Sequence, residues 1–148
     1  MFMPNATKLR QFVYDRITVT GRPPSLAEVA KQFGTSVDGA AGSIRSLNIG
    51  KTVLPHPKTG EIWMAGPFSA DPTAYRVICD GVNYYANCAW DMLGIPAIFG
   101  RPARIETVCT DCGEPMPMTV DPETGPDATG VVHFLLPARK WYDDIGFT

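Results

Sequence analysis

The hydrophobic positions of the first part of the chain recur with the spacing of amphipathic helices. An i, i+3, i+4, i+7, i+8 repeat predicts a first helix whose inner face carries Leu9, Phe12, Val13, Arg16 and Ile17. A Gly-Arg-Pro-Pro sequence at 21–24 interrupts this pattern. Ser25 followed by Glu28 is then the pattern of a capping box, which predicts a second helix over 26–33 that ends at Gly34.

A third helix and a hairpin are predicted next. Thr35 or Ser36 can cap the helix, whose apolar positions would be Val37, Ala40, Ala41, Ile44 and Leu47. Two short apolar runs follow, at 52–54 and 61–65, and a turn containing proline and glycine joins them. Three helices followed by a hairpin is the order of elements in a winged-helix module.

From about residue 68 the pattern changes to short strands around one apolar helix. Residues 75–79 and 103–108 predict strands, and the run 82–93 predicts a helix that stops at Gly94 and Pro96. A tight turn at 109–113 would lead into a returning strand over 116–120. Residues 131–136 predict one more strand.

Charge divides the chain at nearly the same place. Residues 1–60 carry eight Lys/Arg and three Asp/Glu, whereas residues 61–148 carry five and twelve. Two modules with different surfaces explain this difference most simply, and we predict boundaries of 1–67 and 68–148. The expected fold class is α+β: an N-terminal winged-helix-like helical module packed on a small mixed domain with an antiparallel sheet and a central helix.

Hydropathy and cysteine content bear on the compartment. No apolar run approaches the length of a membrane-spanning helix, and the first eight residues lack the apolar core of a signal peptide. We therefore expect a cytoplasmic protein without a membrane partner. In that reducing compartment, Cys79, Cys88, Cys109 and Cys112 are expected to be thiols or metal ligands rather than disulfides.

The pair most in need of an explanation is Cys88 and Asp91, in the predicted 82–93 helix. Residues three positions apart share a helix face, and a carboxyl in an apolar helix is costly unless it is paired or protonated. A thiolate is a soft metal ligand, and a neighbouring acid could protonate a leaving group. The structural alternative is a buried, unreactive Cys88 beside an Asp91 that binds backbone or an arginine.

The Cys109-x-x-Cys112-Gly113 turn allows several interpretations. It has the form of a zinc knuckle, but a structural zinc needs four ligands, and no second knuckle is present in the sequence. A turn with two reduced thiols is the favoured interpretation. A bound zinc, a redox pair and accessory metal ligands stay open.

Nucleic acid is a poor candidate partner. The third predicted helix, which would read a groove in a winged-helix protein, carries one arginine and one aspartate. We expect this module to cover the second one instead.

With these residues considered, the chain resembles the alkylmercury (organomercurial) lyase family. The match is carried by Tyr-Tyr-Ala-Asn-Cys-Ala-Trp-Asp at 84–91, Gly-Ile-Pro-Ala at 94–97, Gly-Arg-Pro-Ala-Arg-Ile-Glu at 100–106, Cys109, Gly-Glu-Pro at 113–115 and Trp-Tyr-Asp-Asp-Ile at 141–145. The resemblance implies protonolysis of carbon–mercury bonds, which releases a hydrocarbon and Hg(II). Cys88 would capture the organomercurial, and Asp91 would transfer the proton to the departing carbon.

The resemblance also implies partners and accessory groups. The substrate would be a small organomercurial, and cellular thiols or a mercuric-ion acceptor would remove Hg(II); no cofactor is required. Cys88 and Asp91 would contact the metal, with Cys79, Cys109 and Cys112 as candidate accessory thiols, although Cys109 matches a family cysteine of structural character. The family's second catalytic cysteine would follow the stretch that ends this sequence at Thr148. The alternative is therefore a non-enzymatic protein that binds or senses mercury or another soft metal.

Overall fold

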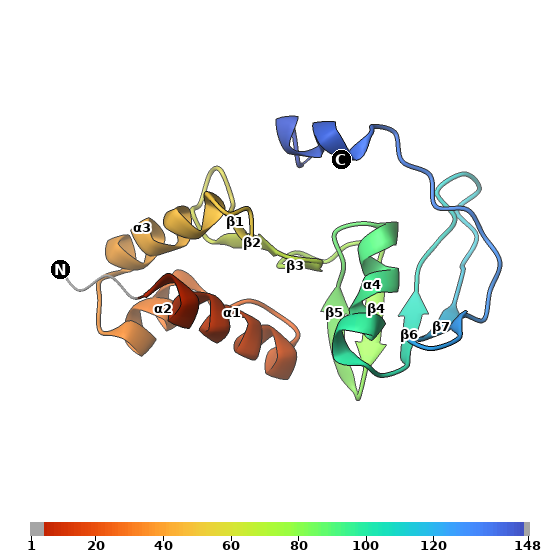
Figure 1. The fold of residues 1–148 in the computed structure, drawn as a ribbon, viewed down its shortest axis with the longest axis horizontal. Coiled ribbons are helices and arrows are strands. Elements are labelled where there is room, and N and C mark those ends of the chain that lie inside the picture. Colours follow the sequence, from red (N-terminus) through yellow and green to blue (C-terminus); the bar gives the residue numbers. More distant parts are fainter. Residues whose placement is uncertain (1–4, 147–148) are drawn as a thin grey trace.

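A computed structural model describes residues 5–146 of the chain. Its N-terminal part consists of helices α1 (Ala6–Thr20), α2 (Leu26–Phe33) and α3 (Val37–Asn48), which confirms the three predicted helices (Figure 1). Their facing sides bury most of the predicted apolar positions, among them Leu9, Val13, Ile17, Ile44 and Leu47, whereas Val37 is 50% exposed. None of the helices among residues 5–146 is long and apolar enough to cross a membrane.

The starts of these helices are set by local side-chain caps. The Ser25 hydroxyl accepts from the Glu28 backbone N–H, and the Glu28 carboxylate accepts from the Ser25 N–H, so the predicted capping box is present. Ser36, rather than Thr35, caps α3 by accepting from the Gly39 N–H. Such caps satisfy backbone donors that have no partner inside the helix.

The predicted hairpin is part of a three-stranded antiparallel sheet. Strands β1 (Val53–Pro55), β2 (Ile62–Ala65) and β3 (Phe68–Ser69) lie in that order, and β3 was not predicted. Phe68 also forms a bridge with Ala86 and packs its ring near those of Tyr84 and Phe99. β3 therefore joins the first sheet to the core of the second part.

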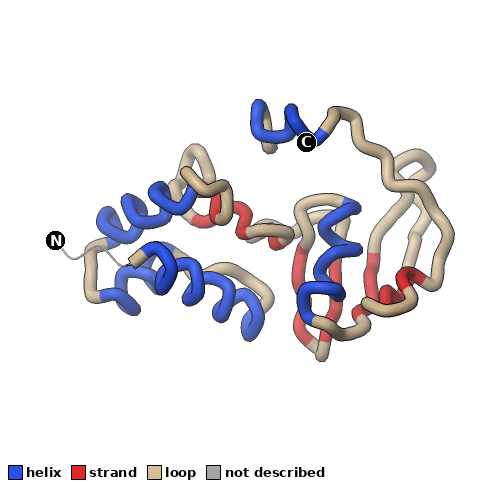
Figure 2. The backbone as a smooth tube through the Cα atoms, in the orientation of Figure 1, coloured by secondary structure: helices blue, strands red, loops and turns tan. Residues whose placement is uncertain are grey.

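The second part is a five-stranded antiparallel sheet with one helix against it. β4 (Arg76–Cys79), β5 (Val82–Tyr85), β6 (Ala103–Glu106), β7 (Met118–Asp121) and β8 (Gly125–Pro126) are arranged in the order β5-β4-β6-β7-β8. Helix α4 (Ala89–Phe99) packs on this sheet through Met92, Ile95 and Pro96 (Figure 2). The α+β class with antiparallel sheets is thus confirmed.

The prediction of one helix over 82–93 was wrong. Asp80 and Gly81 take positive φ values of 49° and 78° and turn the chain back, so that residues 82–85 pair with β4 as strand β5. The helix begins after Cys88, runs through Pro96 and ends at Gly100 in the left-handed conformation. Burial of Pro96 against the sheet compensates for the backbone hydrogen bond that proline removes.

The predicted strand over 131–136 is also wrong. These residues form no strand, and Val131 and Leu135 are 93% and 72% exposed, so their alternation does not mark a buried face. Strand β8 pairs with the outer edge of β7 instead. The chain then crosses back to the 3-10 helix η1 (Ala138–Asp143), where the Lys51 Nζ lies 3.8 Å from the centroid of the Tyr142 ring (Figure 1).

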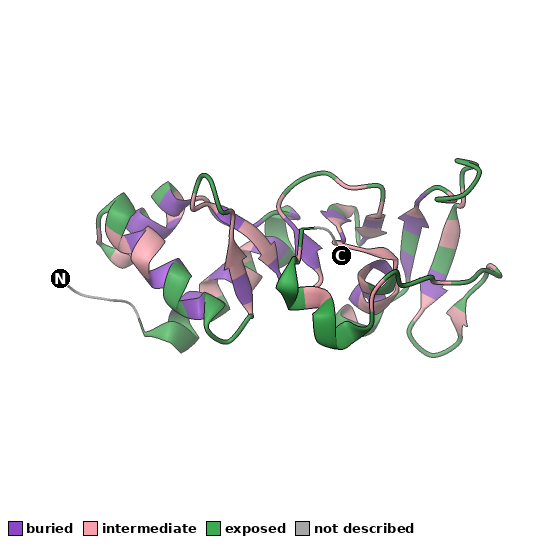
Figure 3. Ribbon diagram, turned by 90° about the horizontal axis from the view of Figure 1, so that it is seen from above, coloured by how far each residue is buried: buried purple, intermediate pink, exposed green. Residues whose placement is uncertain are grey.

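The two parts of the molecule are in direct contact. The Tyr84 hydroxyl on β5 donates to the Thr18 carbonyl of α1 at 2.8 Å. Gly21, after α1, lies against the Asn83 carbonyl of the same strand. Buried residues continue through both parts in Figure 3. The boundary between residues 67 and 68 stays a prediction, since β3 contacts both sheets.

We expect Gly21→Ala to destabilise the protein. A Cβ at this position would lie 2.0 Å from the Asn83 carbonyl oxygen, and Gly21 has φ +78°, where an L side chain is strained. Strain and overlap together should lower the free energy of unfolding by about 2 kcal/mol or more. Urea denaturation measures this change. Gly34→Ala is the control, because Gly34 is also left-handed but has open space around it; equal losses in both variants would contradict the role of the Asn83 contact.

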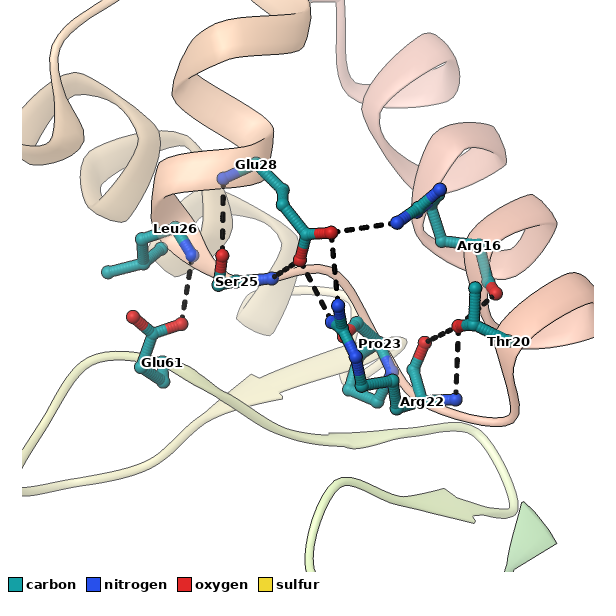
Figure 4. Close-up of polar contacts among 8 residues, drawn as sticks. All are labelled: Arg16, Thr20, Arg22, Pro23, Ser25, Leu26, Glu28 and Glu61. Carbon is teal, nitrogen blue, oxygen red and sulfur yellow. Dashed lines mark hydrogen bonds and ion pairs between the residues drawn. The ribbon is translucent and has the colours of Figure 1, made fainter. Parts of the chain in front are cut away.

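Glu28 is expected to make stability depend on pH. Hydrogen bonds from Arg22 and the Ser25 backbone hold the pKa of this carboxyl well below its ordinary value of 4.5, with a further contribution from Arg16 (Figure 4). A carboxyl with a lowered folded-state pKa stabilises the fold above its unfolded pKa, and this stabilisation is lost as pH falls below about 4.5. At pH 7 the free energy of unfolding of Glu28→Gln, measured by urea denaturation, should therefore be about 1 kcal/mol lower than that of the wild type. This difference should shrink in acid, where the Glu28 carboxylate is protonated. A difference that stays constant with pH would contradict the stabilising role of the carboxylate.

Candidate functional site

Cys88 and Asp91 lie where strand β5 leads into helix α4. Cys88 is the N-cap residue, with extended backbone angles of φ −151° and ψ 177°, and Asp91 is in the first helical turn. The pair is therefore not inside a continuous helix, as the hydrophobic pattern predicted. The close placement of the pair is retained, because each of the two groups is near enough to shift the pKa of the other.

Partial burial dominates the electrostatics of the Cys88 thiol. It raises the pKa of the thiol, and the nearby negative charge of Asp91 acts in the same direction. The backbone N–H groups of Asp91 and Trp90 oppose this rise, although no capping hydrogen bond of normal geometry forms. A helix N-terminus usually favours a thiolate, but here desolvation is the larger effect, so the resting sulfur is a protonated thiol.

The pKa of the Asp91 carboxyl is raised for the same reason. Burial is the largest cause, while hydrogen bonds from the Asn87 amide and the Cys88 thiol act in the opposite direction. Burial therefore disfavours the charged form of both groups. The arrangement can hold one shared proton between sulfur and oxygen and pass it to a neighbouring atom.

Asn87 is a residue of this site that the sequence pattern did not single out. Its Nδ2 donates to the Gly66 carbonyl at 2.8 Å and to Asp91 Oδ2 at 3.2 Å, and its backbone N–H donates to the Pro67 carbonyl at 3.2 Å. Because a backbone carbonyl can only accept a hydrogen bond, the contact with Gly66 requires that Nδ2, and not Oδ1, of the Asn87 amide faces Gly66 and Asp91. Among the residues that the structure describes, the buried Asn87 Oδ1 has no hydrogen-bond partner. The only signal for Asn87 in the sequence was its position directly before Cys88. Its hydrogen bond to Gly66 could not be predicted, because the two residues are far apart in sequence.

An aromatic hollow of about 360 Å³ lies at the start of α4. Its walls are Trp90, Phe134, Leu136, Pro137, Ala138 and Trp141. Trp90, between Cys88 and Asp91 in sequence, has its ring centroid 6.2 Å from that of Phe134, which is 5.3 Å from Trp141. This hollow can take an apolar group.

The other predicted thiols do not join Cys88 and Asp91. Cys79 is buried in the second core, its thiol donates to the Pro102 carbonyl at 3.8 Å, and burial raises the pKa of its thiol. Cys109 and Cys112 lie together in the turn between β6 and β7. Across residues 5–146 no three His, Cys, Asp or Glu side chains are grouped so that they could hold a metal ion.

Comparisons with known proteins identify the family of this chain. The family model described as alkylmercury lyase (MerB) matches residues 68–147, which include the pair and the second sheet. Alkylmercury lyase of Streptomyces lividans is 29% identical over 125 residues, covering 82% of this chain and 56% of that protein. The enzymes of Staphylococcus epidermidis and Pseudomonas putida are 36% identical over 125 residues and 43% identical over 109 residues.

A solved structure shows the same fold. The mercury-bound form of MerB2 superposes with a TM-score of 0.59 at 19% sequence identity, covering 80% of this chain and 57% of that one. The chain spans about half the length of the curated relatives it matches: 56% of the Streptomyces protein and 49% of the Pseudomonas protein.

Proposed function

This chain belongs to the alkylmercury lyase family, and from that premise we propose that it cleaves carbon–mercury bonds by protonolysis at Cys88 and Asp91. The observation that carries the proposal is the half-buried thiol–carboxyl pair at the start of α4, in which burial raises the pKa of both groups. Such a pair combines a soft metal ligand with a proton carrier. Hg(II) is a product of this reaction, which needs no resident cofactor.

In the first step the sulfur binds mercury. The organomercurial cation, R–Hg⁺, forms a bond with the Cys88 sulfur, and the thiol proton moves to the neighbouring Asp91 carboxylate. The raised pKa of Asp91 favours this transfer, because a desolvated carboxyl holds a proton more firmly than one in water. The adduct R–Hg–S and a protonated Asp91 are then side by side.

In the second step the carbon receives that proton. The electron pair of the Hg–C bond takes the proton of Asp91, R–H leaves, Hg(II) stays on the Cys88 sulfur, and Asp91 is again a carboxylate. Proton transfer from a positioned acid avoids release of a free carbanion. Cellular thiols would then remove Hg(II), and the regained proton of Cys88 completes the cycle.

The aromatic hollow at the start of α4 offers a place for the organic group. Trp90 separates Cys88 from Asp91 in sequence and forms one wall of the aromatic hollow, with Phe134 and Trp141 opposite. Apolar walls favour an alkyl or aryl group over water. We propose this hollow as the subsite for the organic part of a small organomercurial.

We further propose that the N-terminal part is a winged-helix module that covers the catalytic part, with the boundary near residue 67. The order α1, α2, α3 and then β1-β2-β3 supports it. Its contribution to the site is the Gly66 carbonyl, which holds the Asn87 amide beside Asp91. This makes it a structural cover in a cytoplasmic enzyme rather than a nucleic-acid reader.

The direct test is hydrocarbon release. Incubation of the protein with phenylmercury and an excess of a small thiol should release benzene, measured by gas chromatography of the headspace, at a rate proportional to protein concentration. A phenylmercury adduct that persists in intact-mass spectra, without benzene above the thiol-only background, would contradict the proposal.

Asn87→Ala is expected to slow cleavage while leaving mercurial binding intact. The variant loses the donor that joins Asp91 to Gly66, so the carboxyl is less well directed at the carbon. Benzene release should fall about tenfold at saturating phenylmercury. Asn83→Ala is the matched control and should keep the wild-type rate, because it removes an exposed asparagine of β5 that only accepts hydrogen bonds from Arg76 of β4. An unchanged rate in Asn87→Ala would contradict the positioning role.

A further inference from the structure

The turn between β6 and β7 holds two thiols on a closed backbone frame. The Cys109 N–H donates to the Glu114 carbonyl at 2.8 Å, and the Gly113 N–H donates to the Cys109 carbonyl at 2.8 Å. Val108 and Pro115 form a bridge just outside this loop. Gly113, at φ +74°, allows the chain to close so tightly.

The two sulfurs of this turn are close to each other. The backbone N–H groups of Cys112 and Asp111, followed by the Cys112 thiol, lower the pKa of the Cys109 thiol, and the Gly113 N–H closes the turn that carries both sulfurs on the Cys109 carbonyl. Backbone N–H groups directed at a sulfur stabilise its anionic, metal-binding form. Cys112 is exposed and Cys109 is partly exposed, whereas the packed thiol of Cys79 is 4% exposed. These two thiols are therefore not core residues.

We propose that Cys109 and Cys112 form a second metal site, which binds one Hg(II) ion through two thiolates and is separate from Cys88. This inference goes beyond the proposed lyase activity, since inorganic Hg(II) from any source would fill the site. Binding replaces the two S–H protons by two S–Hg bonds and releases both protons to solvent, with no change of oxidation state.

The number of ligands selects the metal. A structural zinc takes four protein ligands, and within residues 5–146 no third His, Cys, Asp or Glu side chain completes a group with these two thiols. Hg(II) is satisfied by two thiolates in a nearly linear arrangement. Thiolates also prefer soft metals over magnesium or calcium. A pair of thiols in one turn has the further advantage of a high effective concentration over two separate small thiols.

The test uses the full chain with Cys88→Ser, so that the proposed catalytic sulfur cannot bind the metal. One equivalent of inorganic Hg(II) is added with an excess of glutathione, and native mass spectrometry counts the Hg(II) retained. We expect one Hg(II) per chain, together with ultraviolet sulfur-to-mercury charge-transfer absorption. Cys112→Ser in the same background should lower retention at least about tenfold, because the chelate is lost.

Cys79→Ala in the Cys88→Ser background is the matched control, since it removes a thiol outside the turn and should retain the metal. Far-UV circular dichroism confirms that each variant is folded, and Cys112 is exposed, so its replacement disturbs little packing. Equal retention with and without Cys112, or loss of all Hg(II) to glutathione from the Cys88→Ser chain, overturns the proposal. Neither result depends on benzene release, so the second site and the lyase activity can fail separately.

Discussion

Replacing Cys88 by serine is expected to reduce benzene release from phenylmercury by at least about a thousandfold, to the level of the thiol-containing buffer. A hydroxyl is a hard, weakly acidic group that does not form a stable bond with mercury, so the first step is lost and Asp91 receives no proton from sulfur. Loss of a group that forms the covalent intermediate removes the whole sequence of steps, which explains the large effect.

The measurement combines headspace gas chromatography with intact mass after incubation with phenylmercury. Cys88→Ser should show neither benzene nor a phenylmercury adduct that withstands excess glutathione. Cys79→Ala is the matched thiol control and should react like the wild type, because Cys79 belongs to the core of the second sheet. A Cys88→Ser rate within tenfold of wild type would show that another thiol performs the chemistry.

Asp91→Asn is expected to separate binding from cleavage. The amide is similar in size to the carboxyl, but it cannot accept the Cys88 proton and pass it to carbon. We therefore expect the phenylmercury adduct on Cys88 to form and persist, while benzene release falls by about a hundredfold to ten-thousandfold, the usual contribution of a general acid. The adduct should be visible as a mass increase of one phenylmercury group per chain.

The control for this variant is Asp38→Asn. Asp38 lies in the first turn of α3, as Asp91 does in α4, but it is exposed. Its replacement should leave both adduct formation and benzene release unchanged. If Asp91→Asn cleaves phenylmercury at the wild-type rate, the proton comes from elsewhere, and the assignment of Asp91 is wrong even if Cys88 is confirmed.

Local signals accounted for the N-terminal part of the fold. The helix caps at Ser25 and Ser36 each join a side chain to a backbone N–H three residues away, and α2 ends where Gly34 adopts the left-handed conformation. Their energetics are therefore largely independent of the rest of the chain. β6 and β7, which pair with each other, are also consecutive strands, joined by residues 107–117.

The wrong predictions arose where long-range packing decided the local structure. Residues 82–85 are apolar enough for either a helix or a strand, and it is pairing with β4 that makes them β5. Pro96 should end a helix, yet α4 continues because this turn is buried against the sheet. Residues 131–136 alternate like a strand, but β8 pairs with the edge of β7, and these residues form no strand.

The sequence alone predicted three N-terminal helices, the caps of two of them and an α+β class, and it singled out Cys88 and Asp91 as a candidate thiol–carboxyl pair. The tertiary structure decided that Cys88 caps α4, that burial raises the pKa of both groups, and that Asn87 links Asp91 to Gly66. The physical reason is that helix caps and residue spacing are local along the chain. Desolvation and the contact with Gly66, by contrast, depend on atoms that only the folded chain brings near.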